Sequence, residues 1–160
     1  MLDDGMKGLF VQGLQAMHAA DEQGKITTAD IEKAATDPRL KEALRHAHEV
    51  AGMLDRQLGE VMQAANARPQ PIQNAAIEGI ATDAQRVREM ASDPVARDLG
   101  IIAHAQIALH YHIAAYGTLR SYAQALGNEK AAGALQSMLE QAKGQDETYS
   151  RVARDLLGKG

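Results

Sequence analysis

Three polar side chains fall on helical stripes that are otherwise apolar. The chain has no cysteine, which excludes thiol catalysis and zinc–thiolate sites. Asp21, His112 and Asp146 each interrupt a series of apolar residues spaced three or four apart. Because that spacing brings residues to one face of a helix, all three are expected to point into the protein interior. Two carboxylates and one imidazole are suited to binding a divalent metal or to pairing with one another.

His112 lies in the longest of these stripes, which runs from Asp98 to Gly127. The apolar members of the stripe step by three or four residues along one predicted helix: Ile102, Ala105, Leu109, Tyr116, Leu119, Ala123 and Leu126. His112 is the only strongly polar residue among them. A long helix with one polar residue inside its apolar seam either carries a functional site or retains part of one.

The rest of the chain contains further helical patterns with short connections. They cover residues 3–23, 37–65, 71–91 and 129–157. Thr28 to Ala35 forms either a separate helix capped by Thr28 or a kinked continuation of the first. Asp37–Pro38 and Asp93–Pro94 place a capping residue before a proline, which is typical of a helix start. These patterns predict an all-α fold: residues 1–160 form a single domain, an antiparallel four-helix bundle with one additional short helix.

Composition narrows the classes of partner. The net charge is −4 and no basic tract is present, so neither nucleic acid nor an anionic membrane surface is an expected partner. The sequence contains no basic region followed by an apolar run at its start, and no segment of 18 continuous apolar residues. We therefore expect a cytoplasmic protein.

The string LHYHIAAYGTL, at residues 109–119, resembles a motif of the YciE/YciF family of bacterial ferritin-like stress-response proteins. Members of that family carry Glu-His-Tyr-Glu-Ile-Ala-x-Tyr-Gly-Thr-Leu at this place. Weaker similarity extends over nearly the whole chain, including residues 100–103 upstream and Lys143 and Asp146 downstream. The resemblance implies a ferritin-like bundle in which carboxylates from the four long helices hold a di-iron centre. It also implies iron oxidation or peroxide chemistry.

This sequence departs from the family at the positions that the resemblance assigns to the metal. The residues aligned with the family's carboxylates are Asp21, Val50, Leu109, His112 and Ala142. In the second helix a shifted register would instead bring His46, His48 or Glu49 to the position of Val50. Valine, leucine and alanine coordinate no metal, and packed hydrocarbon often replaces buried charge without loss of stability. We therefore expect that the di-iron centre has been lost.

Two alternatives remain for the polar residues. Asp21, His112 and Asp146, completed by His18, could form a reduced mononuclear metal site. Alternatively, one or both aspartates hold a buried His112 and fix the helix register, an interpretation that we prefer. It predicts that the protein carries no cofactor, with iron or another divalent metal as the alternative. Without a metal, Tyr111 and Tyr116 need hydrogen-bond partners for their hydroxyls.

These observations lead to two hypotheses about function. The first is a non-enzymatic, stress-associated or interaction protein that forms a homodimer through helix packing or binds another, unidentified protein. The second is a metalloprotein with a remodelled site that acts in iron or peroxide handling.

Overall fold

The structure, a computed structural model, describes the backbone of residues 2–158 and the side chains of that range except those of 2–3 and 26–29. It contains five helices: α1 (Leu2–Ala34), α2 (Pro38–Ala64), α3 (Ala75–Met90), α4 (Pro94–Ala125) and α5 (Glu129–Leu157). The described residues form no strand. The prediction of an all-α fold is confirmed.

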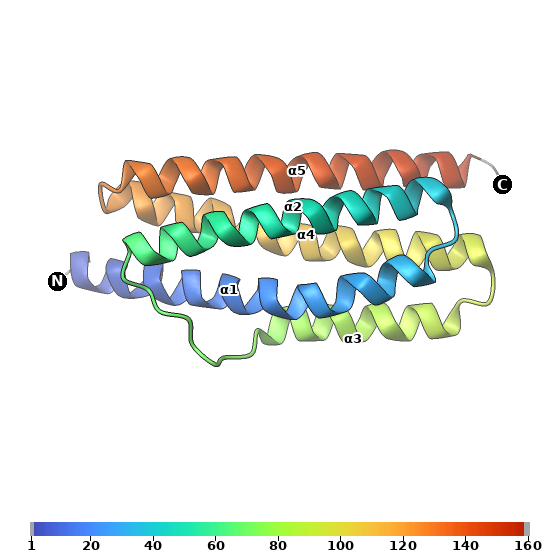
Figure 1. Cartoon of the computed structure of the whole chain (residues 1–160), viewed down its shortest axis with the longest axis horizontal. Helices are drawn as coiled ribbons and strands as arrows, with labels where there is room; N and C mark the ends of the chain where they lie inside the picture. Colours follow the sequence, from blue (N-terminus) through green and yellow to red (C-terminus); the bar gives the residue numbers. More distant parts are fainter. Residues whose placement is uncertain (1, 159–160) are drawn as a thin grey trace.

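The four long helices pack side by side, and α3 lies on the outside (Figure 1). Each long helix runs opposite to its packed neighbours, in the order α1, α2, α5, α4 and back to α1. Helix α3 packs against α4 and α1, and it returns the chain to the opposite end of the bundle after α2. The molecule is therefore an antiparallel four-helix bundle with one additional short helix, as predicted.

Local capping signals set three of the helix starts. Asp37 caps α2 and accepts a hydrogen bond from the backbone N–H two residues later, with Pro38 at the first helical position. Asp93 caps α4 in the same way, at 2.7 Å from the N–H of Ala96. Asn128 caps α5. The helix starts predicted from the two Asp–Pro pairs, and the start predicted at residue 129, are therefore confirmed.

Helix α3 begins at Ala75, so the prediction that it starts at residue 71 was wrong. The cap is Asn74, a buried side chain whose Nδ2 donates to the Ala16 carbonyl at 2.9 Å and to the Tyr111 hydroxyl at 2.7 Å. Because these bonds tie the cap to α1 and α4, tertiary contacts decide where α3 starts. They also give Tyr111 the partner that its hydroxyl needs.

Helix α1 continues without interruption through the region where a break was one of two predictions. The glycine at position 24 and the β-branched residues after it lower helix propensity, but packing against α2, α3 and α4 outweighs a weak local preference. The side chain of Thr28, the predicted cap, lies outside the described residues. No separate helix from 28 to 35 is formed.

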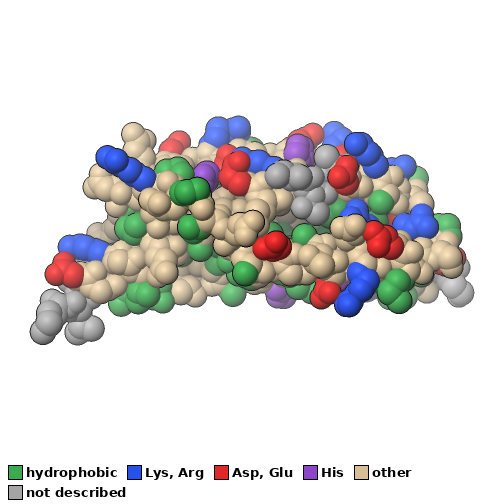
Figure 2. Space-filling view, turned by 90° about the horizontal axis from the view of Figure 1, so that it is seen from below, with side chains coloured by type: hydrophobic (Ala, Val, Ile, Leu, Met, Phe, Trp, Pro, Cys, Tyr) green, Lys and Arg blue, Asp and Glu red, His purple; other side chains and the backbone are tan. Residues whose placement is uncertain are grey.

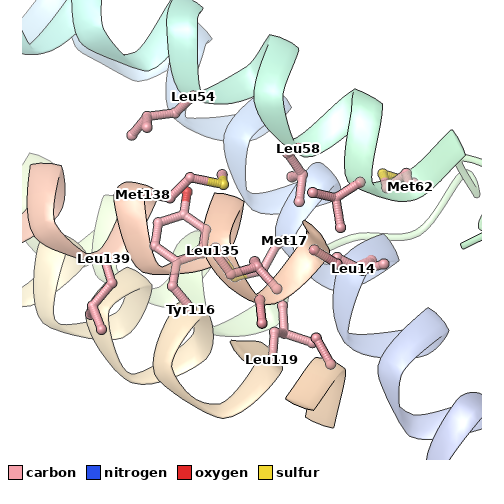
Figure 3. Packing of buried hydrophobic residues seen from close by; sticks show 14 of the residues in the cluster. Leu14, Met17, Leu54, Leu58, Met62, Tyr116, Leu119, Leu135, Met138 and Leu139 are labelled. Atoms are coloured by element: carbon pink, nitrogen blue, oxygen red, sulfur yellow. The ribbon is translucent and has the colours of Figure 1, made fainter. Parts of the chain in front are cut away.

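The buried apolar residues form two clusters along the bundle. The first core cluster includes Phe10, Leu14, Met17, Leu58, Tyr116, Leu119, Leu135 and Met138 (Figure 3). The second core cluster includes Leu40, Leu44, Ile101, Ile102, Tyr149, Val152 and Leu156. Leu109 of α4 packs against both. The two clusters therefore meet near Leu109, which lies about one helical turn from His112 on α4.

A buried carboxylate on α4, that of Asp98, binds the turn between α1 and α2. Asp98 is 1% exposed, and its Oδ1 accepts from the backbone N–H of Thr36 at 2.8 Å. Its Oδ2 accepts from the Thr36 hydroxyl and from the backbone N–H of Asp37, both at 2.7 Å. Asp98 therefore fixes the position of the turn on α4.

Gly13 marks a close approach of α1 to α4. A Cβ atom at this position would lie 2.5 Å from Cδ2 of Leu119, a buried core residue. We expect Gly13→Val to lower the free energy of unfolding by about 1–3 kcal/mol, because the added atoms overpack the interface. Gly117→Val on α4 is the matched control, since a Cβ there meets nothing within 4 Å. Urea unfolding of both variants measures the effect, and equal stability of the two would contradict this account.

The surface carries mixed charges. Figure 2 shows acidic and basic side chains interspersed on one face of the bundle, without a continuous patch of one sign. Among the described residues, no helix has both the length and the apolar character needed to span a bilayer.

Candidate functional site

The centre of the bundle holds a hydrogen-bonded pair formed by Asp21 of α1 and His112 of α4. Nε2 of His112 lies 3.1 Å from Oδ1 of Asp21, and Nδ1 lies 2.8 Å from the backbone carbonyl oxygen of Ala108. The side chains are 20% and 13% exposed for His112 and Asp21 respectively. Both neighbours of the ring are acceptors, so both ring nitrogens donate when the imidazole is protonated. The pair is then an imidazolium bound to a carboxylate.

Two tyrosine rings enclose His112. Its centroid lies 5.7 Å from that of Tyr111, at right angles, and 5.8 Å from that of Tyr116. Burial, followed by the charges of Asp21 and Asp55, raises the pKa of Tyr116 far above its usual value, so the phenol stays neutral. Its hydroxyl has no hydrogen-bond partner among the described residues, and neither has Oδ2 of Asp21. These two polar atoms are therefore free to bind a water or a ligand atom.

His112 is expected to make the protein more stable at acidic than at alkaline pH. Burial lowers the pKa of His112, but the hydrogen bonds to Asp21 and the Ala108 carbonyl and the charge of Asp21 together raise it above 6.5. A raised folded-state pKa gives stability that is complete below about pH 6.5 and is lost as the pH rises through the folded-state value.

Urea unfolding between about pH 6 and pH 9 measures this contribution, since the window begins at the unfolded pKa. We expect His112→Gln to remove that part of the pH dependence, whereas His46→Gln, at an exposed position, keeps it. An unchanged pH profile in the His112 variant would show that the pair is not the source.

Asp146, the second predicted carboxylate, lies with other partners. Its Oδ2 is 3.3 Å from Nε2 of His110, and its Oδ1 accepts from the side-chain amide of Gln106 at 2.9 Å. His110 is two residues from His112 and therefore lies about 200° away around α4. The structure thus brings Asp21 and His112 together and places Asp146 on a different side of α4.

His18, the fourth predicted ligand, belongs to a separate cluster between α1 and α2. Among the described residues, His18, Glu22 and Asp55 are the one group of three metal-ligating side chains whose ligand atoms lie within 4.8 Å of one another. Nζ of Lys25 lies 2.6 Å from Oε1 of Glu22 and 2.9 Å from Oδ2 of Asp55. An ammonium group therefore binds the carboxylates that a metal would use. Neither Lys25 nor Asp55 interrupts an apolar stripe in the way that Asp21 does, so the sequence pattern did not predict their role.

Hydrocarbon side chains occupy the other positions that the resemblance assigns to carboxylates. Val50 and Ala142 are buried in the first core cluster, and Leu109 is half-buried beside His112. The alternatives considered for the second helix (His46, His48 and Glu49) are exposed. Of the predicted ligands, Asp21 and His112 are thus the two that the structure brings together at the bundle centre.

A cavity of about 350 Å³ lies beside the Asp21–His112 pair, and we call it the central cavity. Residues from all five helices line it, among them Leu109 and Ala142. The cavity is mostly apolar, and its volume lies near the lower limit for small-molecule sites. Leu109 and Ala142, two of the positions that the resemblance assigns to carboxylates, therefore border open space as well as hydrocarbon.

Comparison with known proteins identifies the family. Residues 5–159 match the family described as a domain of unknown function (DUF892). The chain is 33% identical to YciF from Escherichia coli strain K12 over 156 residues, which cover 96% of this chain and 93% of YciF.

Solved structures agree with this assignment. The crystal structure of the stress protein YciF from E. coli superimposes with a TM-score of 0.92 at 28% identity, over 97% of this chain and 98% of YciF. YcfI, a proposed structural protein from Rhodopseudomonas palustris, superimposes with a TM-score of 0.87 at 26% identity over 91% and 92% of the two chains. A Xanthomonas campestris protein at 16% identity, with a TM-score of 0.76 over 95% and 93%, shares the fold. The chain therefore belongs to the DUF892 family, as a relative of the ferritin-like YciE/YciF stress-response proteins.

Proposed function

We propose that this protein is a non-enzymatic, stress-associated member of its family, which acts through binding rather than through a di-iron centre. The observation that supports this proposal is the Asp21–His112 pair, in which the carboxylate that remains among the aligned positions is bonded to an imidazole. The stress association comes from the relative YciF, which is a stress protein.

The donor set at the bundle centre does not suit two metal ions. A di-iron centre needs several oxygen donors from facing helices, some of them bridging both ions. Of the aligned positions only Asp21 carries a carboxylate, and Val50, Leu109 and Ala142 contribute no donor atoms. His112 has acceptors at both ring nitrogens, so a metal would have to displace Asp21 or the Ala108 carbonyl from the ring.

Metal analysis tests the proposal directly. Protein purified without chelators should contain far less than one iron, manganese or zinc ion per chain. Protein mixed with ferrous iron under anaerobic conditions should oxidise it no faster than buffer once air is admitted. About one metal per chain that is lost in His112→Ala would overturn the proposal.

The second candidate function is a metalloprotein with a remodelled site, which the cluster of His18, Glu22 and Asp55 favours. In that case iron or another divalent ion would replace the Lys25 ammonium between the carboxylates. Lys25→Met would then tighten metal binding, and Asp55→Asn would abolish it. Zinc titration of these two variants separates the candidates, since neither substitution should produce or remove a site in a protein that binds no metal.

We also propose that two chains associate through their helices. Several large apolar side chains on the helices are exposed, including Met53, Met90, Val95 and Ile107, and an interface would remove them from water. Light scattering at micromolar concentration should give twice the mass of the chain. A mass equal to one chain would contradict the dimer.

A further inference from the structure

The central cavity is elongated along the bundle. On α4 its wall extends from Ile101 to Tyr116, fifteen positions apart, which corresponds to about 22 Å at the helical rise. Its walls are formed largely by small or aliphatic side chains, among them Ile77, Ile80, Ala84, Ala105, Ala108 and Leu109. The side chains of Lys25, His48 and His104 also line it. A long, narrow and apolar space fits an unbranched hydrocarbon chain better than it fits a compact polar molecule.

A cation without a partner lines this cavity. Nε of Arg88, on α3, is buried and has no hydrogen-bond partner, and the guanidinium forms no ion pair with a described residue. Arg88 as a whole is half-buried, and an arginine that has an unbonded buried N–H and no described carboxylate beside it is suited to binding an anion. The neighbouring Val87 lies against Gly100 of α4, where a Cβ would be 2.7 Å from Cγ1 of the valine. Arg88 therefore lies near the Ile101 end of the cavity.

The opposite end of the cavity is polar. Asp21 Oδ2 and the Tyr116 hydroxyl lie there without partners, next to His112. A hydrocarbon chain gains nothing from contact with these atoms, which are better satisfied by water. The apolar length available to a chain therefore ends at about the level of His112. From Gly100 to His112 is twelve positions, or about 18 Å.

We propose that the central cavity binds a free fatty acid, with its carboxylate on the Arg88 guanidinium and its chain lying along Ala105 and Ala108 of α4. A guanidinium can bind a carboxylate through two parallel hydrogen bonds, which a hydroxyl or an ester cannot accept as well. In a zigzag chain with carbon–carbon bonds of about 1.5 Å, the available length corresponds to roughly 14 carbons. The proposal does not depend on whether the protein binds a metal.

Calorimetric titration of the purified full chain with saturated fatty acids of increasing length tests the proposal. Affinity should rise about fourfold for each added CH₂, the value expected for burial of that group, and should stop rising near roughly 14 carbons. The primary alcohol of the same length should bind at least tenfold more weakly, because it lacks the charge-assisted bond to Arg88. Equal affinity of acid and alcohol, or no binding by either, would overturn the proposal.

Two variants, each with a control on the same helix, locate the ligand. Arg88→Met should weaken the acid at least tenfold and leave the alcohol unchanged. Arg86→Met should change neither, because Arg86 is exposed and bonded to Asp83 at 2.9 Å.

Ala108→Phe fills the apolar part of the cavity and should abolish binding of a 14-carbon acid. Ala114→Phe, at an exposed position of α4, should not. Thermal unfolding followed by circular dichroism verifies that each variant is folded. Normal acid binding by folded Arg88→Met or by folded Ala108→Phe would place the ligand elsewhere and overturn the proposal.

Discussion

Replacing His112 with leucine is expected to destabilise the protein by about 3 kcal/mol at pH 7, because it leaves the Asp21 carboxylate in the interior with neither oxygen bonded. At present Oδ1 is bonded to the imidazole and Oδ2 has no partner among the described residues. The side chain cannot turn fully into water, since Asp21 is only 13% exposed, and taking up a proton at pH 7 would itself cost free energy. His112→Leu therefore removes the one hydrogen bond that this buried carboxylate accepts from a described side chain.

The reverse substitution should cost less. In Asp21→Leu the imidazole can become neutral and still donate from Nδ1 to the Ala108 carbonyl. We expect a loss of about 1 kcal/mol for that variant, in the range of one net hydrogen bond. The double variant should be close to wild type, because hydrocarbon replaces both charges.

Urea unfolding of the wild type, both single variants and the double variant gives the coupling energy of the pair. His104→Leu is the control, because the one bond of His104 to a described residue is to a backbone carbonyl, that of Gly100 at 2.9 Å. If the double variant is as unstable as His112→Leu alone, the loss comes from packing and not from the unpaired carboxylate.

Asp98→Ala is expected to cause the other large loss, about 4 kcal/mol, since three hydrogen bonds to one buried carboxylate disappear together. Two of the donors are backbone N–H groups in the α1–α2 turn, at Thr36 and Asp37, and the third is the Thr36 hydroxyl. For a chain of this size the melting temperature should fall by roughly 10 °C.

Asp98→Asn tests the role of the charge. It keeps the shape but turns an acceptor into an amide that faces donors, so it should recover only part of the stability. Asp93→Ala is the comparison, because it removes an exposed helix cap worth about 1 kcal/mol. Equal melting temperatures for the Asp93 and Asp98 variants would show that the turn does not depend on α4.

Features that depend on near neighbours could be predicted from the sequence. Asp37 and Asp93 cap the helices that their following prolines begin, and both donors lie within three residues. Asp98 could not be predicted in its role, because its partners lie 61 and 62 residues earlier in the chain. Asn74, which moves the start of α3, also takes its partners from distant helices.

The same distinction applies to the candidate site. Apolar periodicity placed Asp21 and His112 on inward faces, and the structure brings them into contact. Periodicity does not fix how each helix is rotated against its neighbour, so it could not show that Asp146 would lie beside His110. It also gave no sign of Lys25 between Glu22 and Asp55, because Asp55 comes from the next helix.

The connectivity of the bundle has a consequence for the order in which it folds. Residues 35–37 and 126–128 are short turns, so α1–α2 and α4–α5 are two helical hairpins whose internal contacts are close in sequence. Such hairpins form early, and the contacts between them close a much longer loop. The bonds of Asp98 to the α1–α2 turn and of His112 to Asp21 both connect one hairpin to the other. We therefore expect the hydrogen bonds of Asp98 and Asp21 to form after the folding transition state. Removing either carboxylate should then speed unfolding more than it slows folding.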